Sequence, residues 1–161
     1  MLKPLLGALA LTALFSGSTL AEPRQAAFFG IHFINTSMQN QSEEEAARLK
    51  AVEDRLVTAL AESGQYSMID ISPVADDAAF YENLAFCNGC DTDLAKELGA
   101  DVAITGEIQK TSNLILSMSL YIRDAETGAL VAGGSADMRG NTDQSWFRTT
   151  DWLLRNRVLR Q

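Results

Sequence analysis

The chain has 161 residues, two of them cysteine, and carries a formal net charge of −8 because 21 acidic residues outnumber 13 basic ones. An acidic chain is repelled by nucleic-acid phosphates and by anionic lipid headgroups, so the composition argues against both as partners. The length suits one domain of ordinary size, and the sequence shows no internal repeat, low-complexity segment or linker.

The first 21 residues, Met1–Ala21, have the pattern of a secretory signal peptide. Lys3 supplies the positive start, an apolar core spans residues 5–15, and small residues precede a cut before Glu22. A membrane anchor is the alternative, but this core is shorter than the ~20 residues that a spanning helix needs. No cysteine follows the signal for lipid attachment. We therefore expect a periplasmic protein without a stable membrane anchor, whose single globular domain is residues 22–161.

The first predicted elements of that domain are a strand and a helix. An apolar run over residues 26–34 is typical of a buried strand. Ser42 and Glu45 form a capping-box pattern, in which each side chain can accept the other residue's amide. Apolar residues then recur at helical spacing until Gly64, where the predicted helix ends. The glutamates at this helix start favour the helix dipole and need no metal ion to explain them.

The next part of the chain predicts shorter elements. Residues 66–71 form a second predicted strand, and the helix before it allows a right-handed crossover from the first. Residues 74–86 permit a short helix. Residues 91–98 predict another, with Asp91 or Thr92 as its cap.

The centre of the sheet is predicted over residues 101–139 as three consecutive antiparallel strands. The middle strand alternates between apolar and mostly polar side chains from Leu114 to Arg123, as a half-buried strand does. The third strand, residues 129–139, is built from small residues, which weaken a strand unless something packs closely on it. We infer that a helix covers this strand. Whether it is an edge of the sheet stays open.

The last predicted element is a helix that follows a break at residues 139–143 and begins at Thr142 or Asp143. The order is therefore β-α-β-α-β-β-β-α. We predict an α/β (α+β) fold, with a mixed sheet of about five strands and helices packed on it in two or three layers.

Cys87 and Cys90 are spaced C-x-x-C, which has several interpretations. Haem attachment needs a histidine next, where the chain has Asp91. Zinc needs four ligands, and two thiols with the single His32 fall short unless a carboxylate or another chain joins. A thiol redox pair is an option because C-x-x-C at a helix start can lower a thiol pKa. A structural disulfide in an oxidising compartment is the other, although so short a loop gains little from closure.

No catalytic set is evident in the sequence. His32 is the only histidine, and there is no G-x-S-x-G motif and no phosphate-binding glycine loop. Asp76 and Asp77 are adjacent and point to different faces, which is poor geometry for an acid–base pair. We therefore expect no enzymatic activity, no cofactor and no metal.

A polar cluster before the last helix has two interpretations. It is either a recognition patch with an exposed tryptophan beside arginine, or a capped helix start with Trp146 buried and Arg139 paired to Asp143. The cluster consists of Arg139, Asn141, Thr142, Asp143 and Trp146.

Three motifs carry a resemblance to a known family: Cys87-Asn88-Gly89-Cys90, Leu98-Gly99-Ala100-Asp101 leading into Gly106, and Arg139-Gly140-Asn141-Thr142-Asp143 with Trp146 behind it. With these motifs, nearly the whole mature chain resembles a family of small exported bacterial proteins classed only as a domain of unknown function. The resemblance transfers no catalytic residue.

The layout is more distantly similar to the N-terminal domain of TolB and to the related folds of CsgG and LpoB. The matching segments are His32-Phe33-Ile34-Asn35, Met68-Ile69-Asp70, Gly99 to Gly106 and Asp124 to Gly128. These motifs are mostly structural, so the likeness speaks for the fold more than for the function. CsgG and LpoB are lipoproteins and TolB carries a propeller, features that this sequence does not show. The resemblance implies an envelope protein that binds other proteins.

Three functions follow from the sequence. The preferred one is a non-enzymatic periplasmic accessory protein that binds another periplasmic or envelope protein. The second is a thiol–disulfide redox protein that acts through Cys87 and Cys90, and the third is a metal carrier that uses both thiols and His32. The sequence does not indicate an oligomeric state.

Overall fold

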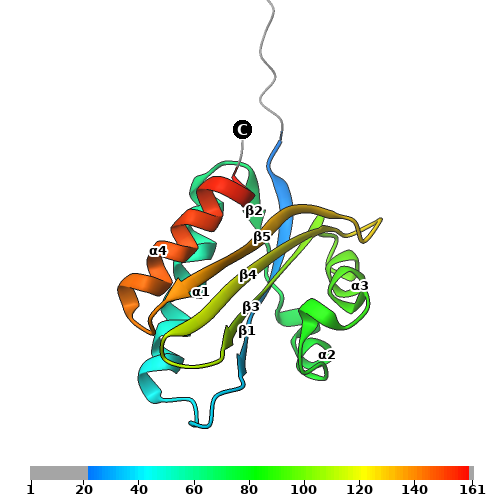
Figure 1. Cartoon of the computed structure of the whole chain (residues 1–161). Helices are drawn as coiled ribbons and strands as arrows, with labels where there is room; N and C mark the ends of the chain where they lie inside the picture. Colours follow the sequence, from blue (N-terminus) through cyan, green and yellow to red (C-terminus); the bar gives the residue numbers. More distant parts are fainter. Residues whose placement is uncertain (1–21, 160–161) are drawn as a thin grey trace, which may run out of the picture.

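The computed structural model describes residues 22–159 and places a five-stranded mixed sheet between two groups of helices (Figure 1). The predicted signal peptide, residues 1–21, lies outside the described residues. Within residues 22–159, no helix is both long and apolar enough to span a membrane. The predicted α+β class and the mixed sheet of about five strands are confirmed.

The elements follow the predicted order, with additional short turns between them. They are β1 (Arg24–Asn35), α1 (Glu43–Glu62), β2 (Tyr66–Met68), the 3₁₀ turn η1 (Ser72–Val74), α2 (Ala75–Ala79), the 3₁₀ turn η2 (Leu84–Phe86), α3 (Cys90–Glu97), β3 (Val102–Lys110), β4 (Ile115–Asp124), β5 (Leu130–Arg139), α4 (Asp143–Leu153) and the π-helical turn η3 (Leu154–Val158). The strand order across the sheet is β2-β1-β3-β4-β5. Strand β1 is parallel to both β2 and β3, whereas β3, β4 and β5 are antiparallel.

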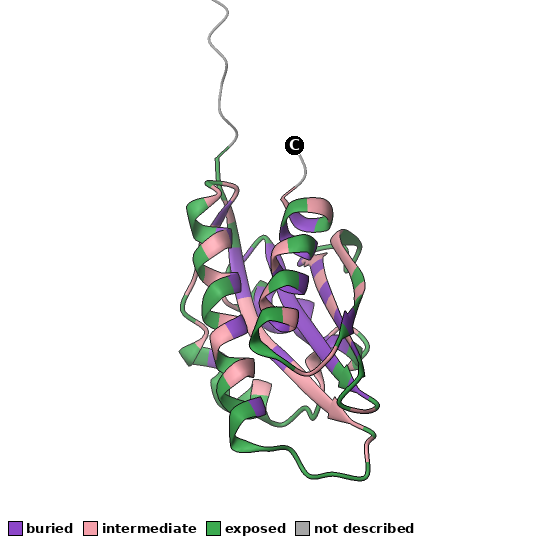
Figure 2. Cartoon of the chain, turned by 60° about the vertical axis from the view of Figure 1, so that its left-hand side comes forward, coloured by how far each residue is buried: buried purple, intermediate pink, exposed green. Residues whose placement is uncertain are grey.

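Helices α1 and α4 cover one face of the sheet, and α2 and α3 lie on the other (Figure 1). The larger core cluster lies under α1 and α4, where Leu56 and Leu153 meet Ile104 and Met118 of the sheet. The smaller cluster, on the α3 side, consists largely of alanines, including Ala95 and Ala103. In Figure 2, the buried residues lie on the strands and on the inward sides of the helices. Small alanine contacts let α3 approach the sheet closely.

Helix α1 begins as predicted. The Ser42 hydroxyl accepts the Glu45 amide, and the Glu45 carboxylate accepts the Ser42 amide, which completes the capping box. The C-terminal cap of α1 is Ser63, and it is followed by Gly64 at a φ of 68°. The left-handed conformation of Gly64 turns the chain into β2.

Strand β2 is shorter than the predicted strand over residues 66–71. Its last backbone bond to β1 joins the Ile69 amide to the Ala26 carbonyl. The Asp70 carboxylate then accepts both the amide and the hydroxyl of Ser72, which turns the chain away from the sheet. In place of the one short helix predicted in residues 74–86, the structure has η1, α2 and η2 in succession.

The predicted cap of α3 was wrong. The helix begins at Cys90, with Gly89 as its cap at a φ of 104°, and Asp91 and Thr92 are both buried. Asp91 faces the sheet because Arg123 of β4 binds it, with 2.7 Å between Nη1 and Oδ2. The Asp91 carboxylate therefore forms an ion pair with the sheet, whereas the sequence pattern had predicted that it caps the helix.

Strand β4 has the predicted alternation, with Leu116, Met118, Leu120 and Ile122 in the core. Strand β5 is an edge of the sheet, which settles the question that the sequence left open. The inferred helix over it is confirmed, since Ala132 and Ala136 pack into the cluster that holds Trp146. Gly133 allows β4 and β5 to approach, because a Cβ there would lie 2.2 Å from the Leu120 carbonyl oxygen.

Candidate functional site

A disulfide joins Cys87 and Cys90, whose Cα atoms are 5.6 Å apart. Cys87 directly follows η2, and Cys90 is the buried first residue of α3. The Arg123 guanidinium binds the chain on both sides of this loop. It donates to Asp91 Oδ2 at 2.7 Å and to the Ala85 carbonyl at 3.1 Å. The disulfide therefore closes a short loop in the layer that covers the second face of the sheet. Whether the bond is structural or redox-active stays a prediction.

The metal-carrier hypothesis does not fit this arrangement. Within residues 22–159, no group of three or more His, Cys, Asp or Glu side chains is placed to hold a metal ion. The two cysteines are bonded to each other, and His32 lies on β1 in register with Glu107. The predicted ligand set of Cys87, Cys90 and His32 is thus not assembled.

The polar cluster before α4 follows the structural interpretation at Trp146. The Trp146 side chain is fully buried and stacks on Phe33 with ring centroids 6.0 Å apart, as the interpretation of a capped helix start predicted. Its indole Nε1 donates to Asn141 Oδ1 at 3.0 Å. Thr142 caps α4 by accepting the Ser145 amide.

The pairing of Arg139 with Asp143, which belonged to the same interpretation, was wrong. Asp143 pairs with Arg48 of α1, with 2.7 Å between Oδ1 and Nε, and Arg139 is exposed on β5. The Arg48 guanidinium also lies over the Trp146 ring, 5.4 Å from its centroid. The cluster therefore connects α4 to α1. Its predicted role as a recognition patch stays a prediction for the four members other than Trp146.

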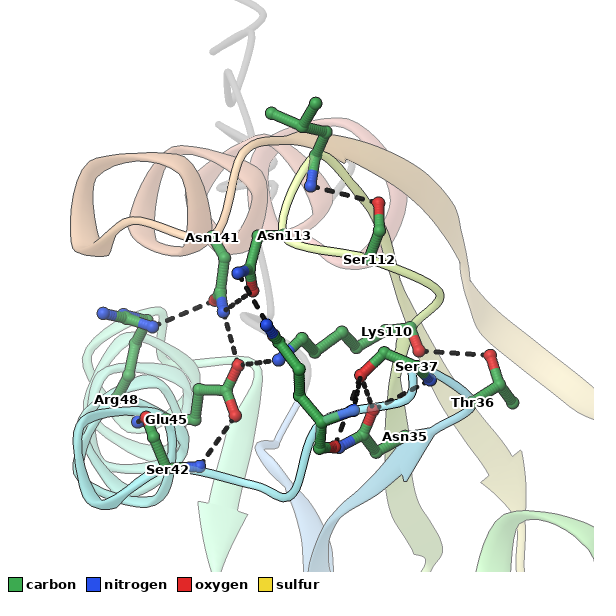
Figure 3. A network of polar contacts seen from close by, with 12 residues as sticks. Asn35, Thr36, Ser37, Ser42, Glu45, Arg48, Lys110, Ser112, Asn113 and Asn141 are labelled. Carbon is green, nitrogen blue, oxygen red and sulfur yellow. Dashed lines mark hydrogen bonds and ion pairs between the residues drawn. The ribbon is translucent and has the colours of Figure 1, made fainter.

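A buried ion pair between Lys110 and Glu45 lies beside this cluster (Figure 3). The Lys110 Nζ is 2.5 Å from Glu45 Oε1, and the two side chains are 2% and 3% exposed. The Asn141 side-chain amide donates to the same Glu45 oxygen, and Arg48 Nη1 donates to Asn141 Oδ1 at 3.0 Å. We call Glu45, Lys110, Asn141 and Arg48 the Glu45 network.

The Glu45 network joins parts of the chain that are far apart in sequence: α1, the end of β3 and the loop before α4 (Figure 3). Burial alone would raise the pKa of the Glu45 carboxyl. Hydrogen bonds from Lys110, the Ser42 amide and Asn141 outweigh this effect and hold the pKa of Glu45 below its ordinary value. The carboxylate is thus stabilised in its charged form, and it holds α1 to the end of β3 and to the loop before α4. Its bonds are satisfied within the chain, which argues against a catalytic role.

Sequence reasoning missed the Glu45 network because it considered Glu45 only as part of a helix start and assigned no partner to Lys110. One signal was present: Lys110 follows Ile104 and Ile108 at even spacing, on the inward side of β3. A lysine at an inward position of a strand calls for a buried carboxylate partner.

A second feature is a hollow of about 350 Å³ beside β1, which we call the β1-edge hollow. It forms because β2 ends at Met68 and the chain then crosses to the other face of the sheet, leaving the rest of β1 without a neighbouring strand on that side. The lining comes from β1, α1, the segment from η1 to η2, and β3: Phe29, Gly30, Ile31, His32, Glu53, Ile71, Ala75, Ala78, Ala79, Tyr81, Glu82, Asn83, Leu84, Ala85, Thr105 and Gly106.

The polar lining of the β1-edge hollow is acidic. Glu53 and Glu82 line it, and no lysine or arginine does. Glu53 Oε1 accepts the Ile31 amide at 2.8 Å. Burial raises the pKa of Glu53, with the Ile31 hydrogen bond opposing that effect. A cationic group entering the hollow would therefore meet two carboxylates and no lysine or arginine, with His32 as the one side chain of the lining that can carry a positive charge.

Thr105 also lines the β1-edge hollow, and its side chain is the one buried polar group of residues 22–159 without a hydrogen-bond partner. Thr105 is only 2% exposed. A buried hydroxyl without a partner costs free energy, on the order of 1–3 kcal/mol, so such groups are rare and call for an explanation. A polar group of a bound ligand would supply the missing hydrogen bond.

Three exposed aromatic side chains lie in the segment from α2 to η2, and one of them, Tyr81, lines the hollow. Phe80 is 85% exposed, Phe86 67% and Tyr81 39%. Phe80 and Tyr81 contact each other edge to face, and Phe86 does the same with Tyr121 of β4. We call Phe80, Tyr81 and Phe86 the aromatic rim. Large aromatic groups that remain exposed beside a hollow are typical of surfaces that bind other molecules.

Several solved structures share this fold. The C-terminal domain of LpoB from Salmonella enterica has a TM-score of 0.51 at 12% identity, with 76% of this chain and 87% of that chain covered. The lipoprotein GNA1162 from Neisseria meningitidis has a TM-score of 0.51 at 16% identity, with 75% and 84% covered. The PelC dodecamer from Paraburkholderia phytofirmans has a TM-score of 0.51 at 14% identity, with 91% and 95% covered. At these identities the likeness shows the fold alone, and it confirms the predicted resemblance to LpoB at that level.

Among curated proteins, none matches the chain in sequence. A family model does match, over residues 24–158, and its description reads "Protein of unknown function (DUF2380)". The match begins at the first residue of β1 and ends at the last residue of η3, so it covers all the elements of the described fold.

Proposed function

We propose, from the premise that the chain belongs to the family described as "Protein of unknown function (DUF2380)", that it is a non-enzymatic protein-binding domain of the bacterial periplasm. The observation that carries this proposal is the aromatic rim beside the β1-edge hollow. Three large aromatic side chains within seven residues of sequence remain exposed there, although the same chain buries Trp146 completely. A partner that covers the rim would remove this apolar area from water.

The comparisons support a role in the cell envelope. One structure of the same fold is described as a lipoprotein, and another as a dodecamer, so this fold occurs both in a lipoprotein and in a protein assembly. The predicted signal peptide, Met1–Ala21, agrees with export. The partner we propose is therefore another periplasmic or envelope protein.

The buried polar groups support a binding role rather than catalysis. The Glu45–Lys110 pair is satisfied within the chain and buried from solvent. The Glu107 carboxylate is likewise held within the chain, by Asn83 and Tyr121 at 2.6 and 3.2 Å. What remains available at the surface is aromatic and acidic, which suits recognition of a protein surface with apolar and basic groups.

The test is affinity capture from the native periplasm with the full chain and with a Phe80→Ser, Phe86→Ser variant. Both side chains are exposed, so the variant should fold, and circular dichroism checks this. A matched control is Leu130→Ser, Val131→Ser, which removes two exposed apolar side chains from the β5 edge. We expect the same captured partner with the wild type and the control, and its loss with the rim variant.

The proposal is then checked with the purified partner. Loss of a central aromatic contact typically weakens binding by ~2 kcal/mol or more, about thirtyfold in Kd. Equal affinities for the wild type and the rim variant would mean that the partner binds another surface and not the aromatic rim. Repeated capture without any partner would remove the support for the proposal.

A thiol–disulfide function is the second candidate, favoured by the bond between Cys87 and Cys90 at the start of α3. A C-x-x-C pair at a helix start can have a lowered thiol pKa when reduced. This function requires that a Cys87→Ser, Cys90→Ser variant lose its cellular activity while keeping its fold. An unchanged phenotype in that variant would exclude it.

A further inference from the structure

The free edge of β1 begins where β2 ends. Strand β1 runs from Arg24 to Asn35, but β2 pairs only with Arg24–Ala26. On its other side, β1 pairs with β3 as far as Asn35. Along residues 27–35, no strand of the described chain lies on the β2 side, so the backbone groups that point there have no ladder partner from a strand.

A bulge at Gly30 sets which backbone groups point outward. Gly30 has a φ of 86°, and the register of β1 with β3 shifts between Phe28 and Ile31. Beyond this bulge, the Ile31 amide points away from β3, because it donates to Glu53. Backbone groups alternate in direction along a strand, so Phe33 presents its amide and carbonyl to the same outer side as Ile31.

Glu53 occupies the position that a strand neighbour would take at Ile31. Its Oε1 accepts the Ile31 amide at 2.8 Å, as the carbonyl of an added strand would. Gly30 leaves room for it, since a Cβ there would lie 3.1 Å from that same oxygen. The edge is thus protected by a carboxylate that a strand carbonyl can replace, and the displaced carboxylate would then need a cation.

The β1-edge hollow beside this edge has the chemistry of a site for basic side chains. Glu53 and Glu82 line it without a lysine or arginine, its walls include alanines and Leu84, and the Thr105 hydroxyl lacks a partner. Its volume of about 350 Å³ is at the lower end of ligand sites, which span ~300–1,000 Å³. The hollow therefore accommodates a few side chains rather than a folded surface. Apolar walls suit the stem of lysine or arginine, and the carboxylates suit its charged end.

We infer that the β1-edge hollow binds an extended, basic segment of the partner, which adds to the free edge of β1 as a strand and places a lysine or arginine between Glu53 and Glu82. This inference rests on the proposed protein-binding function and specifies the partner's chemistry. Main-chain hydrogen bonds to β1 supply affinity, and the alternate side chains that enter the hollow supply specificity.

The test uses a short synthetic peptide that alternates valine and lysine, with a valine–glutamate peptide of the same length for comparison. Binding to the full chain is measured by fluorescence anisotropy at low salt, and backbone contacts by amide hydrogen exchange. We expect the lysine peptide to bind, the glutamate peptide not to bind, and exchange at Phe33 to slow in the complex. Binding of both peptides alike, or no binding of the lysine peptide, would overturn the inference.

Two variants locate the site. Glu53→Gln with Glu82→Gln removes both charges and keeps an acceptor for the Ile31 amide. Its matched control is Glu62→Gln with Glu97→Gln, two exposed glutamates outside the hollow. We expect the first pair to weaken peptide binding about fivefold or more, and the control to change it by less than about twofold. Equal losses in the two double variants would mean non-specific attraction to an acidic protein and would overturn the inference.

Thr105→Val tests the hollow without changing charge. Valine has the same shape and removes a hydroxyl that has no partner, so the fold should keep its stability or gain some. We expect weaker peptide binding with an unchanged or higher Tm. Lysine amide serves as a further probe, because equal affinity for it and for the peptide would indicate a small-cation site and rule out strand addition. Loss of the native partner in the rim variant, with no peptide binding, would overturn this inference and leave the proposed function standing.

Discussion

Lys110 and Glu45 form an ion pair that is almost completely buried, since their side chains are 2% and 3% exposed. The two residues are 65 positions apart in the chain and lie on β3 and α1. Removing both charges from water is costly, and the pair is tolerated because Asn141 and the Ser42 amide supply further hydrogen bonds to the carboxylate. The pair therefore fixes how α1 lies on the sheet more than it adds net stability.

Glu45→Gln should destabilise the chain strongly, because it leaves the Lys110 ammonium buried without a counter-charge. Breaking a buried pair typically costs ~3–5 kcal/mol. Replacing both partners, as in Glu45→Gln with Lys110→Met, should recover most of that loss. Chemical denaturation of the two variants measures the difference. If the double variant were as unstable as the single one, hydrogen bonding within the Glu45 network, and not charge, would be the dominant contribution.

The Glu45 carboxylate also makes the stability of the chain depend on pH. The pKa of Glu45 is held below its ordinary value of 4.5, so its contribution to stability is fully present above that value and is lost as the pH falls towards the lowered one. Other carboxylates with lowered pKa values, such as Asp151 beside Arg55, contribute in the same direction. The measurement is therefore the difference in unfolding free energy between wild type and Glu45→Gln across this range. It should shrink with falling pH, and a constant difference would contradict the assignment.

Gly133→Ala should destabilise the chain by more than Gly128→Ala. Both glycines have positive φ, 130° and 70°, so both variants carry backbone strain on the order of 1–3 kcal/mol. Only at Gly133 would the new Cβ also meet a backbone atom, 2.2 Å from the Leu120 carbonyl oxygen, whereas the space around Gly128 is open. Thermal unfolding of the two variants isolates the cost of that contact. Similar Tm losses would mean that β4 and β5 separate easily at this edge.

Local patterns were sufficient to predict the elements of the fold. The capping box of Ser42 and Glu45 and the alternation along β4 depend on neighbouring residues, and both are present in the structure. The helix over β5 was predicted because its small residues required a partner. These features were accessible since sequence spacing alone determines which side chains share a face.

The site could not be predicted in the same way, because it depends on pairs that are distant in sequence. Asp143 is closer in sequence to Arg139 but pairs with Arg48, 95 residues away. The hollow results from the early end of β2, and strand ends are set by competing turns such as the one at Asp70. Glu53 belongs to no motif, and Thr105 falls in the Gly99 to Gly106 segment only as a strand residue, so no sequence signal marked either of them as part of a site.

Cys87→Ser with Cys90→Ser should lower stability only modestly, because the closed loop has four residues. The chain-entropy relation gives about 2 kcal/mol for so short a loop. The reduction potential of the pair distinguishes its two roles, and thiol alkylation across redox buffers measures it. A value below about −300 mV would mark a structural bond. A value near about −200 mV or higher would mark a labile pair and put the redox function ahead of protein binding.

Glu53→Gln should stabilise the chain at neutral pH, because it removes a half-buried charge and keeps an oxygen that accepts the Ile31 amide. Burial raises the pKa of Glu53 above its ordinary value of 4.5. A group with a raised folded-state pKa contributes stability below its ordinary value and loses that contribution as the pH rises through the raised one. The advantage of the variant should therefore be present at pH 7 and disappear as the pH falls below that ordinary value, where the unfolded carboxyl also becomes protonated.

The control for this prediction is Glu62→Gln on the same helix, whose side chain is exposed and makes no contact with β1 in the hollow. Denaturant unfolding of the three proteins at several pH values gives the comparison. If Glu53→Gln were less stable than wild type at pH 7, the charged hydrogen bond to Ile31 would outweigh the cost of burial. Glu53 would then hold the β1 edge closed more tightly than an added strand could replace, and the strand-addition inference would lose its premise.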